Sequence, residues 1–210
     1  MAENTIVSFF VRHGQTTLNA QNMFRGAMNP DLNAKGRQDA HVLAKYFEPI
    51  DLSVIFYSDK KRSTETAHII SKRKPGIGCF GTPNLWAWNV GKFSGKEKNA
   101  ENKAELEYYI QNPDIPIPEG ESLNEFKSRI QPCIKEAIQV ADAMGAPTLC
   151  VVHSSVIHEV GSMINGSNTS SLVEPGGVCA VSYDSEHGIL SASPIFKKTT
   201  QEPGRVDTVS

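Results

Sequence analysis

Residues Ile6–Thr16 read IVSFFVRHGQT, and this short run sets the architecture expected for the rest of the chain. Its first part is mostly apolar and rich in β-branched and aromatic residues, which is typical of a strand buried on both faces. The run then changes abruptly to Arg12, His13 and Gly14. In open α/β sheets ligands bind beyond the carboxyl ends of the strands. A buried strand that ends in polar residues therefore predicts a site at that end.

Apolar runs and helical periodicity alternate through the remaining sequence. Further strands are expected at 53–58 and 147–152, with two late strands near 178–183 and 189–195. Helices are expected at 34–46, 60–72, 101–111, 122–144 and 156–164. This alternation predicts an α/β fold of three layers, α/β/α, in which helices cover both faces of a mostly parallel central sheet.

Capping residues are expected to set the helix boundaries. Asn33 suits the N-cap of the helix over 34–46, and Pro49 suits its end. Ser58 or Asp59 is the expected N-cap of the next helix.

No linker or shift in composition divides the 210 residues, so we expect one domain over residues 1–196. The segment at about 76–120 is the least regular, and such insertions often carry specificity. The polar residues 197–210 are expected to form a disordered tail.

The charge balance argues against several classes of partner. There are 21 Lys and Arg against 23 Asp and Glu, a net charge of −2, with no basic block. We therefore expect no nucleic acid and no membrane as partner. The N-terminus has no signal-peptide layout, and no apolar run approaches the roughly 18 residues that span a bilayer. The four cysteines are widely spaced without a metal-ligand pattern, as in a cytoplasmic protein with reduced thiols.

Three of the expected strands lead to chemically active side chains. The first ends at Arg12 and His13, the second precedes Arg62 by one helical turn, and the third ends at His153. Each residue has an ordinary interpretation, because a lone histidine is usually structural and an early helical arginine is usually solvated. If the strands are neighbours, however, two arginines and two histidines meet in one crevice, and arginine matches a phosphate well. The residues alone thus indicate an anion-binding α/β enzyme with a histidine nucleophile or base.

Four ordered blocks resemble the histidine phosphatase superfamily, also called phosphoglycerate mutase-like. They are VRHGQTTLNAQNMFRGAMNPDLNAKGRQDA at Val11–Ala40, YSDKKRSTETA at Tyr57–Ala67, PEGESLNEFKSRI at Pro118–Ile130 and VVHSSVI at Val151–Ile157. The resemblance implies that His13 attacks phosphorus and forms a phosphohistidine, which water then hydrolyses. It also implies that Arg12, Arg62 and His153 hold the phosphoryl oxygens, with no metal and no cofactor.

Further residues are expected around the substrate. Asn19, Gln15 and Thr16 match positions that line the phosphate in the family, and Gly14 allows close approach of a ligand. The cationic loops that hold Arg25, Trp86 and Trp88 could bind a second anionic group, and a ring of the substrate could stack on a tryptophan. A loop whose charges are only solvated would have the same composition. The full set expected to contact phosphate or substrate is Gly14, Gln15, Thr16, Asn19, Arg25, Gly26, Trp86, Trp88, Ser154 and Ser155.

Two positions depart from the family pattern. Ser154 follows the second histidine where the family usually has glycine. The segment Leu85–Gly95, LWAWNVGKFSG, aligns with a family segment whose glutamate protonates the leaving oxygen, and Ala87 occupies the place of that glutamate. Either a natural loss or an engineered inactivation explains the alanine. Another carboxylate, such as Glu119 or Glu121, could also have taken over as the acid.

The preferred function is hydrolysis of a small phosphorylated metabolite, with activity reduced by Ala87. One alternative is a catalytically dead phosphate-binding or interaction module, which the alanine favours. A second and less favoured alternative is a phosphoglycerate-type mutase, whose distinctive continuation the residues after Ala87 match only in part. The oligomeric state is open between monomer and homodimer.

Overall fold

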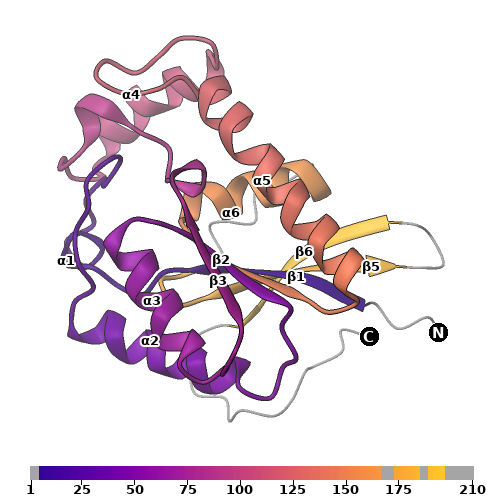
Figure 1. The fold of residues 1–210 in the computed structure, drawn as a ribbon. Helices are drawn as coiled ribbons and strands as arrows, with labels where there is room; N and C mark the ends of the chain where they lie inside the picture. Colours follow the sequence, from indigo (N-terminus) through magenta and orange to yellow (C-terminus); the bar gives the residue numbers. More distant parts are fainter. Residues whose placement is uncertain (1–4, 167–172, 185–188, 197–210) are drawn as a thin grey trace.

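The computed structural model describes residues 5–166, 173–184 and 189–196, so the expected tail over 197–210 lies outside the described residues. Six strands form one sheet in the order β3-β2-β4-β1-β5-β6 (Figure 1). The strands are β1 (Thr5–Arg12), β2 (Val54–Ser58), β3 (Gly78–Thr82), β4 (Thr148–Val152), β5 (Val178–Asp184) and β6 (Ile189–Phe196).

The sheet is mixed, with a parallel majority. The pairs β3–β2, β2–β4 and β4–β1 are parallel, whereas β5 is antiparallel to both β1 and β6. The predicted α/β fold with a mostly parallel sheet is therefore confirmed. Strand β4 lies between β1 and β2, which brings the carboxyl ends of these three parallel strands to one edge.

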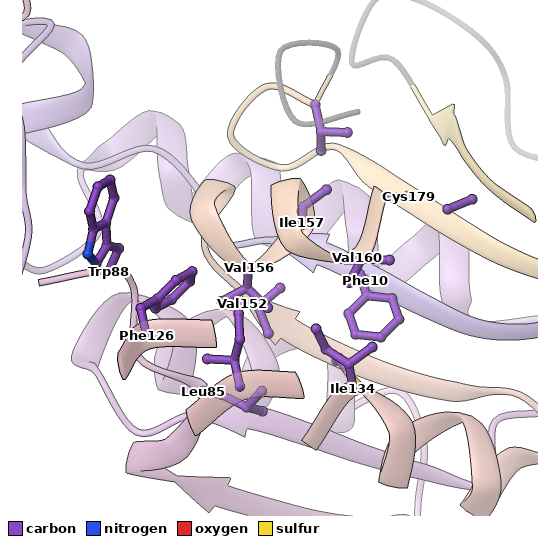
Figure 2. Close-up of a cluster of buried hydrophobic side chains, with 14 of the residues drawn as sticks. Phe10, Leu85, Trp88, Phe126, Ile134, Val152, Val156, Ile157, Val160 and Cys179 are labelled. Atoms are coloured by element: carbon purple, nitrogen blue, oxygen red, sulfur yellow. The ribbon is translucent and has the colours of Figure 1, made fainter. Parts of the chain in front are cut away.

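Helices cover both faces of the sheet, as Figure 1 shows. The α-helices are α1 (Thr17–Ala20), α2 (Ala34–Phe47), α3 (Lys61–Ser71), α4 (Ala100–Gln111), α5 (Leu123–Met144) and α6 (Ser154–Asn165), and short 3-10 helices span Pro83–Leu85 and Gly91–Phe93. One buried cluster joins α2 and α3 to the sheet, and a second joins α5 and α6 to the opposite face (Figure 2).

Alternating side chains of β1 belong to the two buried clusters on opposite faces of the sheet. Phe9 and Val11 pack with the α2 and α3 side, whereas Phe10 packs with α5 and α6. All three are at most 2% exposed. Because successive side chains of a strand point to opposite faces, a continuous apolar run is what a sheet with two covered faces requires. This packing explains why Ile6–Val11 has no polar alternation.

The segment between α3 and α5 differs from the expectation of a mainly irregular insertion. It contains β3, an edge strand that pairs in parallel with β2 and that the sequence analysis did not predict. Its sequence GCFGT has two glycines, which normally weaken a strand. A Cβ atom at Gly81 would come too close to the Tyr57 ring, so the glycine leaves space for that ring.

Two predicted caps had different outcomes. Asn33 caps α2, because its side chain accepts a hydrogen bond from the Gly36 N–H at 2.8 Å. The prediction for α3 was wrong, because its N-cap is Lys60, which makes no side-chain capping bond. The side chains of Ser58 and Asp59 instead bond to His153 and to the Trp86 indole. Tertiary contacts at the site therefore replaced the local cap.

Candidate active site

The pairing of β1 with β4 brings two histidines together. Arg12 is the register partner of Val152, and the His13 N–H donates to the Val152 carbonyl at 3.1 Å. His153 follows Val152 directly, and the ring centroids of His13 and His153 lie 5.2 Å apart. Both rings are at most 1% exposed.

Hydrogen bonds assign the tautomer of His13. The carbonyl oxygen of Gly14 can only accept, so the His13 Nδ1 that lies 2.7 Å from it carries a proton. On the opposite side of the ring, Nε2 accepts a hydrogen bond from Nε–H of Arg62 at 3.1 Å. The ring is therefore neutral, with the lone pair on Nε2, and this nitrogen faces the guanidinium of Arg62.

Burial and neighbouring cations both keep His13 neutral. Burial lowers its pKa well below the ordinary value of 6.5, and the charges of Arg62, Arg25 and Arg12 lower it further. The hydrogen bond to the Gly14 carbonyl opposes these effects only in part. A histidine held neutral at physiological pH keeps its lone pair available for nucleophilic attack.

Three arginines converge on this ring with little counter-charge. Burial and mutual repulsion lower the pKa of Arg25 to about 9, and burial lowers that of Arg62 to about 10. Burial also lowers the pKa of Arg12, which Glu174 partly offsets. Burying cations close together is costly unless an anion joins them. The cluster therefore matches a multiply charged anion.

Unpaired donors at the same place support this interpretation. Among the described residues, buried nitrogen atoms without a hydrogen-bond partner are Arg12 Nε, Arg25 Nε, Arg62 Nη2 and His153 Nδ1. The arginine nitrogens are donors only, so they require an acceptor. A phosphoryl group supplies several acceptor oxygens and negative charge, which fits this set.

The second histidine is oriented by Ser58 at the end of β2. The Nε2 atom of His153 lies 2.9 Å from the Ser58 hydroxyl, and both side chains are buried. Burial, together with Arg62 and His13, holds the pKa of His153 well below 6.5. The sequence placed Ser58 at a strand end, but its contact with His153 depends on β2 and β4 being adjacent.

The loop after His13 is packed tightly against the start of α2. A Cβ atom on Gly14 would overlap the Gly36 carbonyl oxygen, so this approach requires glycine. Gln15 accepts a hydrogen bond from the Asn33 side chain at 3.0 Å. Thr16 and Asn19 bond to each other in a capping box at the start of α1. These residues hold the loop in place, and their contact with phosphate stays a prediction.

The two tryptophans of the segment Leu85–Gly95 lie in different environments. The Trp88 indole N–H donates to the Glu121 carbonyl at 3.2 Å, and the Trp88 backbone N–H donates to the Ser155 hydroxyl at 3.1 Å. The Trp88 ring lies beside Phe126 (Figure 2). Trp86 is 36% exposed and packs under the Lys60 ammonium, 3.6 Å from the ring centroid.

Ala87 lines a cavity of about 420 Å³, together with Arg25, Gly26, Trp88, Ser154 and Ser155. Trp86, which we had expected at the substrate, is not among the residues that line this cavity.

The two carboxylates offered as alternative acids, Glu119 and Glu121, do not line the cavity beside Ala87. Glu121 accepts hydrogen bonds from the Asn89 N–H at 2.8 Å and from Arg129 at 2.7 Å. Glu119 is exposed, and neither Glu119 nor Glu121 lines the cavity. The carboxylate that does line it is Glu159, which the sequence analysis did not single out. Glu159 accepts from Gln131 at 2.7 Å.

Metal and membrane features are absent from the part of the chain that the structure describes. Residues 5–166, 173–184 and 189–196 contain no group of three or more His, Cys, Asp or Glu side chains that could hold a metal ion. Over the same ranges, no helix combines the length and apolar character needed to cross a bilayer.

The lowered pKa values of His13 and His153 predict a pH dependence of stability. Above an unfolded-state pKa of about 6.5 both states leave these rings neutral. As the pH falls from about 6.5 towards the lower folded-state values, the unfolded chain binds protons that the folded chain does not bind. We expect the free energy of unfolding, measured with urea in phosphate-free buffer, to fall by up to about 2 kcal/mol per histidine between about pH 7 and about pH 5.

The control for this prediction is a pair of variants. The double variant His13→Asn, His153→Asn should lose most of this acid dependence, whereas His41→Asn on the exposed side of α2 should keep it. An unchanged dependence in the double variant would contradict the assignment.

The chain is similar to known proteins over most of its length. The family description "Histidine phosphatase superfamily (branch 1)" matches residues 8–192. The chain is 24% identical over 190 residues to a predicted phosphoserine phosphatase of Hydrogenobacter thermophilus, covering 87% of this chain and 92% of that protein. It is 27% identical over 179 residues to a 2,3-bisphosphoglycerate-dependent phosphoglycerate mutase of Bartonella henselae, covering 81% and 86% of the two chains.

The fold also matches solved structures. A mycobacterial glucosyl-3-phosphoglycerate phosphatase, solved with VO3, aligns with a TM-score of 0.72 at 18% identity and covers 95% of this chain and 100% of that chain. At this identity the likeness shows the fold alone. The family match over most of the chain, together with the arginine and histidine cluster at the sheet edge, shows that this protein belongs to the histidine phosphatase superfamily.

Proposed function

We propose that the protein hydrolyses a small-molecule phosphomonoester through a phosphohistidine on His13. The observation that carries this proposal is the neutral, buried His13 ring, whose Nε2 lone pair faces Arg62 amid three arginines. A binding module needs cations for an anion, but it does not need a neutral nitrogen nucleophile whose tautomer is set by a backbone carbonyl.

The reaction takes place in two balanced steps. In the first, the Nε2 lone pair of His13 forms a bond to phosphorus as the ester P–O bond breaks, and the leaving oxygen departs with the bonding electrons and then takes a proton from water. In the second, water attacks the phosphorus and releases a proton to solvent, the P–N bond breaks with its electrons returning to Nε2, and inorganic phosphate leaves. Splitting the displacement in this way replaces one difficult step with two easier ones.

The buried cations supply electrostatic stabilisation. Arg12, Arg62 and His153 would hold the phosphoryl oxygens, and their positions are fixed before substrate arrives by hydrogen bonds to the Val173 carbonyl, the Met28 carbonyl and Ser58. Donors that are already oriented need no reorganisation as charge moves towards the leaving group. The chemistry requires no metal, because the arginines neutralise the charge that a metal would otherwise neutralise.

The direct test is turnover of 4-nitrophenyl phosphate in the presence of EDTA, with vanadate as a competing anion. We expect metal-independent release of nitrophenol, inhibition by vanadate, and a base-stable, acid-labile phosphoenzyme on His13 when the reaction is quenched. Vanadate binding without any turnover would instead support the phosphate-binding module. Transfer of phosphate between positions of phosphoglycerate, faster than its hydrolysis, would support the mutase.

The proposal also covers the class of substrate and the cellular location. We expect a small phosphorylated metabolite as the substrate and a cytoplasmic location. Cys79, Cys133, Cys150 and Cys179 are all free, which suits a reducing compartment.

A further inference from the structure

The cavity beside Ala87 is more apolar than a phosphate site requires. Leu106 and Ile110 of α4, Leu123 and Phe126 of α5, and the ring of Trp88 form much of its wall. Its volume of about 420 Å³ lies within the range of small-molecule sites and exceeds what a phosphoryl group would fill. An apolar wall of this extent indicates that the rest of the substrate is apolar too.

The cavity adjoins the phosphate-binding cluster. Arg25 lines it, and the same guanidinium lies close enough to Arg12 and Arg62 for their charges to lower its pKa. Ser154, which follows His153, lines it as well. A phosphoryl group held by the arginines would therefore direct its ester oxygen and leaving group towards the apolar wall.

The position that the family resemblance assigns to the acid carries alanine. Ala87 has no proton to give, and Glu121 is bound to Arg129 away from the cavity wall. Glu159 is 3% exposed, accepts from Gln131, and lies 3.9 Å from the Lys127 ammonium. The Glu159 carboxylate therefore already has a hydrogen-bond donor and a cation as partners. Because Ala87 offers no acidic proton, a leaving group that departs without protonation suits this site best.

We propose that the substrate is an aryl phosphate, whose aromatic ring occupies the cavity formed by Trp88, Phe126 and the apolar residues of α4 and α5. Two independent observations converge on this class, namely an apolar cavity with aromatic walls and an alanine at the position where the family resemblance implies the acid. A phenolate departs far more readily than an alkoxide, and its ring packs well against aromatic side chains. This inference rests on the proposed function for its chemistry, but the ring-binding cavity can be tested without turnover.

The test of the cavity uses non-hydrolysable phosphonates and calorimetry. We expect 2-naphthylmethylphosphonate to bind about 10- to 100-fold more tightly than benzylphosphonate, because the second ring buries additional apolar area. Ile110→Asp should remove most of this preference while leaving the affinity for inorganic vanadate unchanged. Ile110 is 41% exposed, so the protein should tolerate the change, and Ile115→Asp is the matched control, because Ile115 is 40% exposed and does not line the cavity.

Turnover then tests the leaving group. We expect 2-naphthyl phosphate to be hydrolysed at least about 100-fold faster than octyl phosphate, which is apolar but leaves as an alkoxide. Equal affinity of the two phosphonates, or an unchanged preference in Ile110→Asp, would overturn the ring-binding cavity even if the enzyme is active. Equal turnover of octyl and naphthyl phosphate would overturn the aryl class. A naphthyl preference in binding with no turnover of any ester would overturn the proposed function alone.

Discussion

His13→Ala should abolish hydrolysis of aryl phosphates, with a loss of about 10⁴-fold or more in kcat. The imidazole Nε2 is the atom that forms the covalent bond, and alanine offers no nucleophile in its place. Activated esters such as 4-nitrophenyl phosphate are the strictest substrates for this test, because their leaving group needs no acid. Steady-state assays with purified protein give the rate, and quenched mass spectrometry gives the phosphoenzyme.

Two controls separate chemistry from folding in this experiment. His41→Ala removes an exposed histidine on α2 and should keep full activity. Vanadate binding to the His13→Ala protein should persist, because the three arginines remain. Near-normal turnover by the His13→Ala protein would end the covalent mechanism, and loss of vanadate binding together with turnover would point to a collapsed site.

Ala87→Glu should raise kcat on alkyl phosphates by about 10²–10⁴-fold, which corresponds to about 3–5 kcal/mol of barrier. An alkoxide leaves poorly at neutral pH, so a positioned acid accelerates its departure more than that of a phenolate. Ala87 lies on the wall of a cavity of about 420 Å³, which gives a longer side chain room to reach a leaving group. The ratio of aryl to alkyl rates should fall accordingly.

The matched control is Ala87→Gln, which has nearly the shape of glutamate but no acidic proton. It should leave the alkyl rate close to that of the unchanged protein. If Ala87→Glu changes neither the rates nor their ratio, then position 87 is not the acid site and the alignment of LWAWNVGKFSG with the family segment is wrong. Glu121→Gln tests the rival acid, and we expect no selective loss on alkyl esters, because Glu121 is already bound to Arg129.

Sequence periodicity predicted most of the regular elements, because a buried strand or an amphipathic helix is recorded in adjacent residues. The run Ile6–Val11, the capping of α2 by Asn33, and helix α5 with its caps Ser122 and Gly145 follow from local preferences alone. Strand β3 was missed because its glycine-containing sequence has weak strand propensity. Its pairing with β2 stabilises it from outside the segment.

The amino-acid sequence by itself determined the α/β class and, through the family blocks, pointed to Arg12, His13, Arg62 and His153. Tertiary structure alone decided how these residues are used. The tautomer of His13 depends on the Gly14 carbonyl and on Arg62, which lies 49 positions away in the chain. The buried arginine nitrogens that lack a hydrogen-bond partner are likewise determined by the packing of the whole fold.

The same holds for the second half of the site. The two tryptophans of LWAWNVGKFSG flank Ala87 and look alike in sequence. Trp88, however, donates its backbone N–H to Ser155 and lines the cavity, whereas the Trp86 ring lies against the Lys60 ammonium. Ser58 and Asp59 were available as helix caps, but His153 and Trp86 bound them instead. Local patterns specify which face of an element is apolar. Contacts between distant segments determine which hydrogen-bond partner each polar side chain has and how deeply it is buried. These contacts form only when the sheet and its two helical layers have packed together.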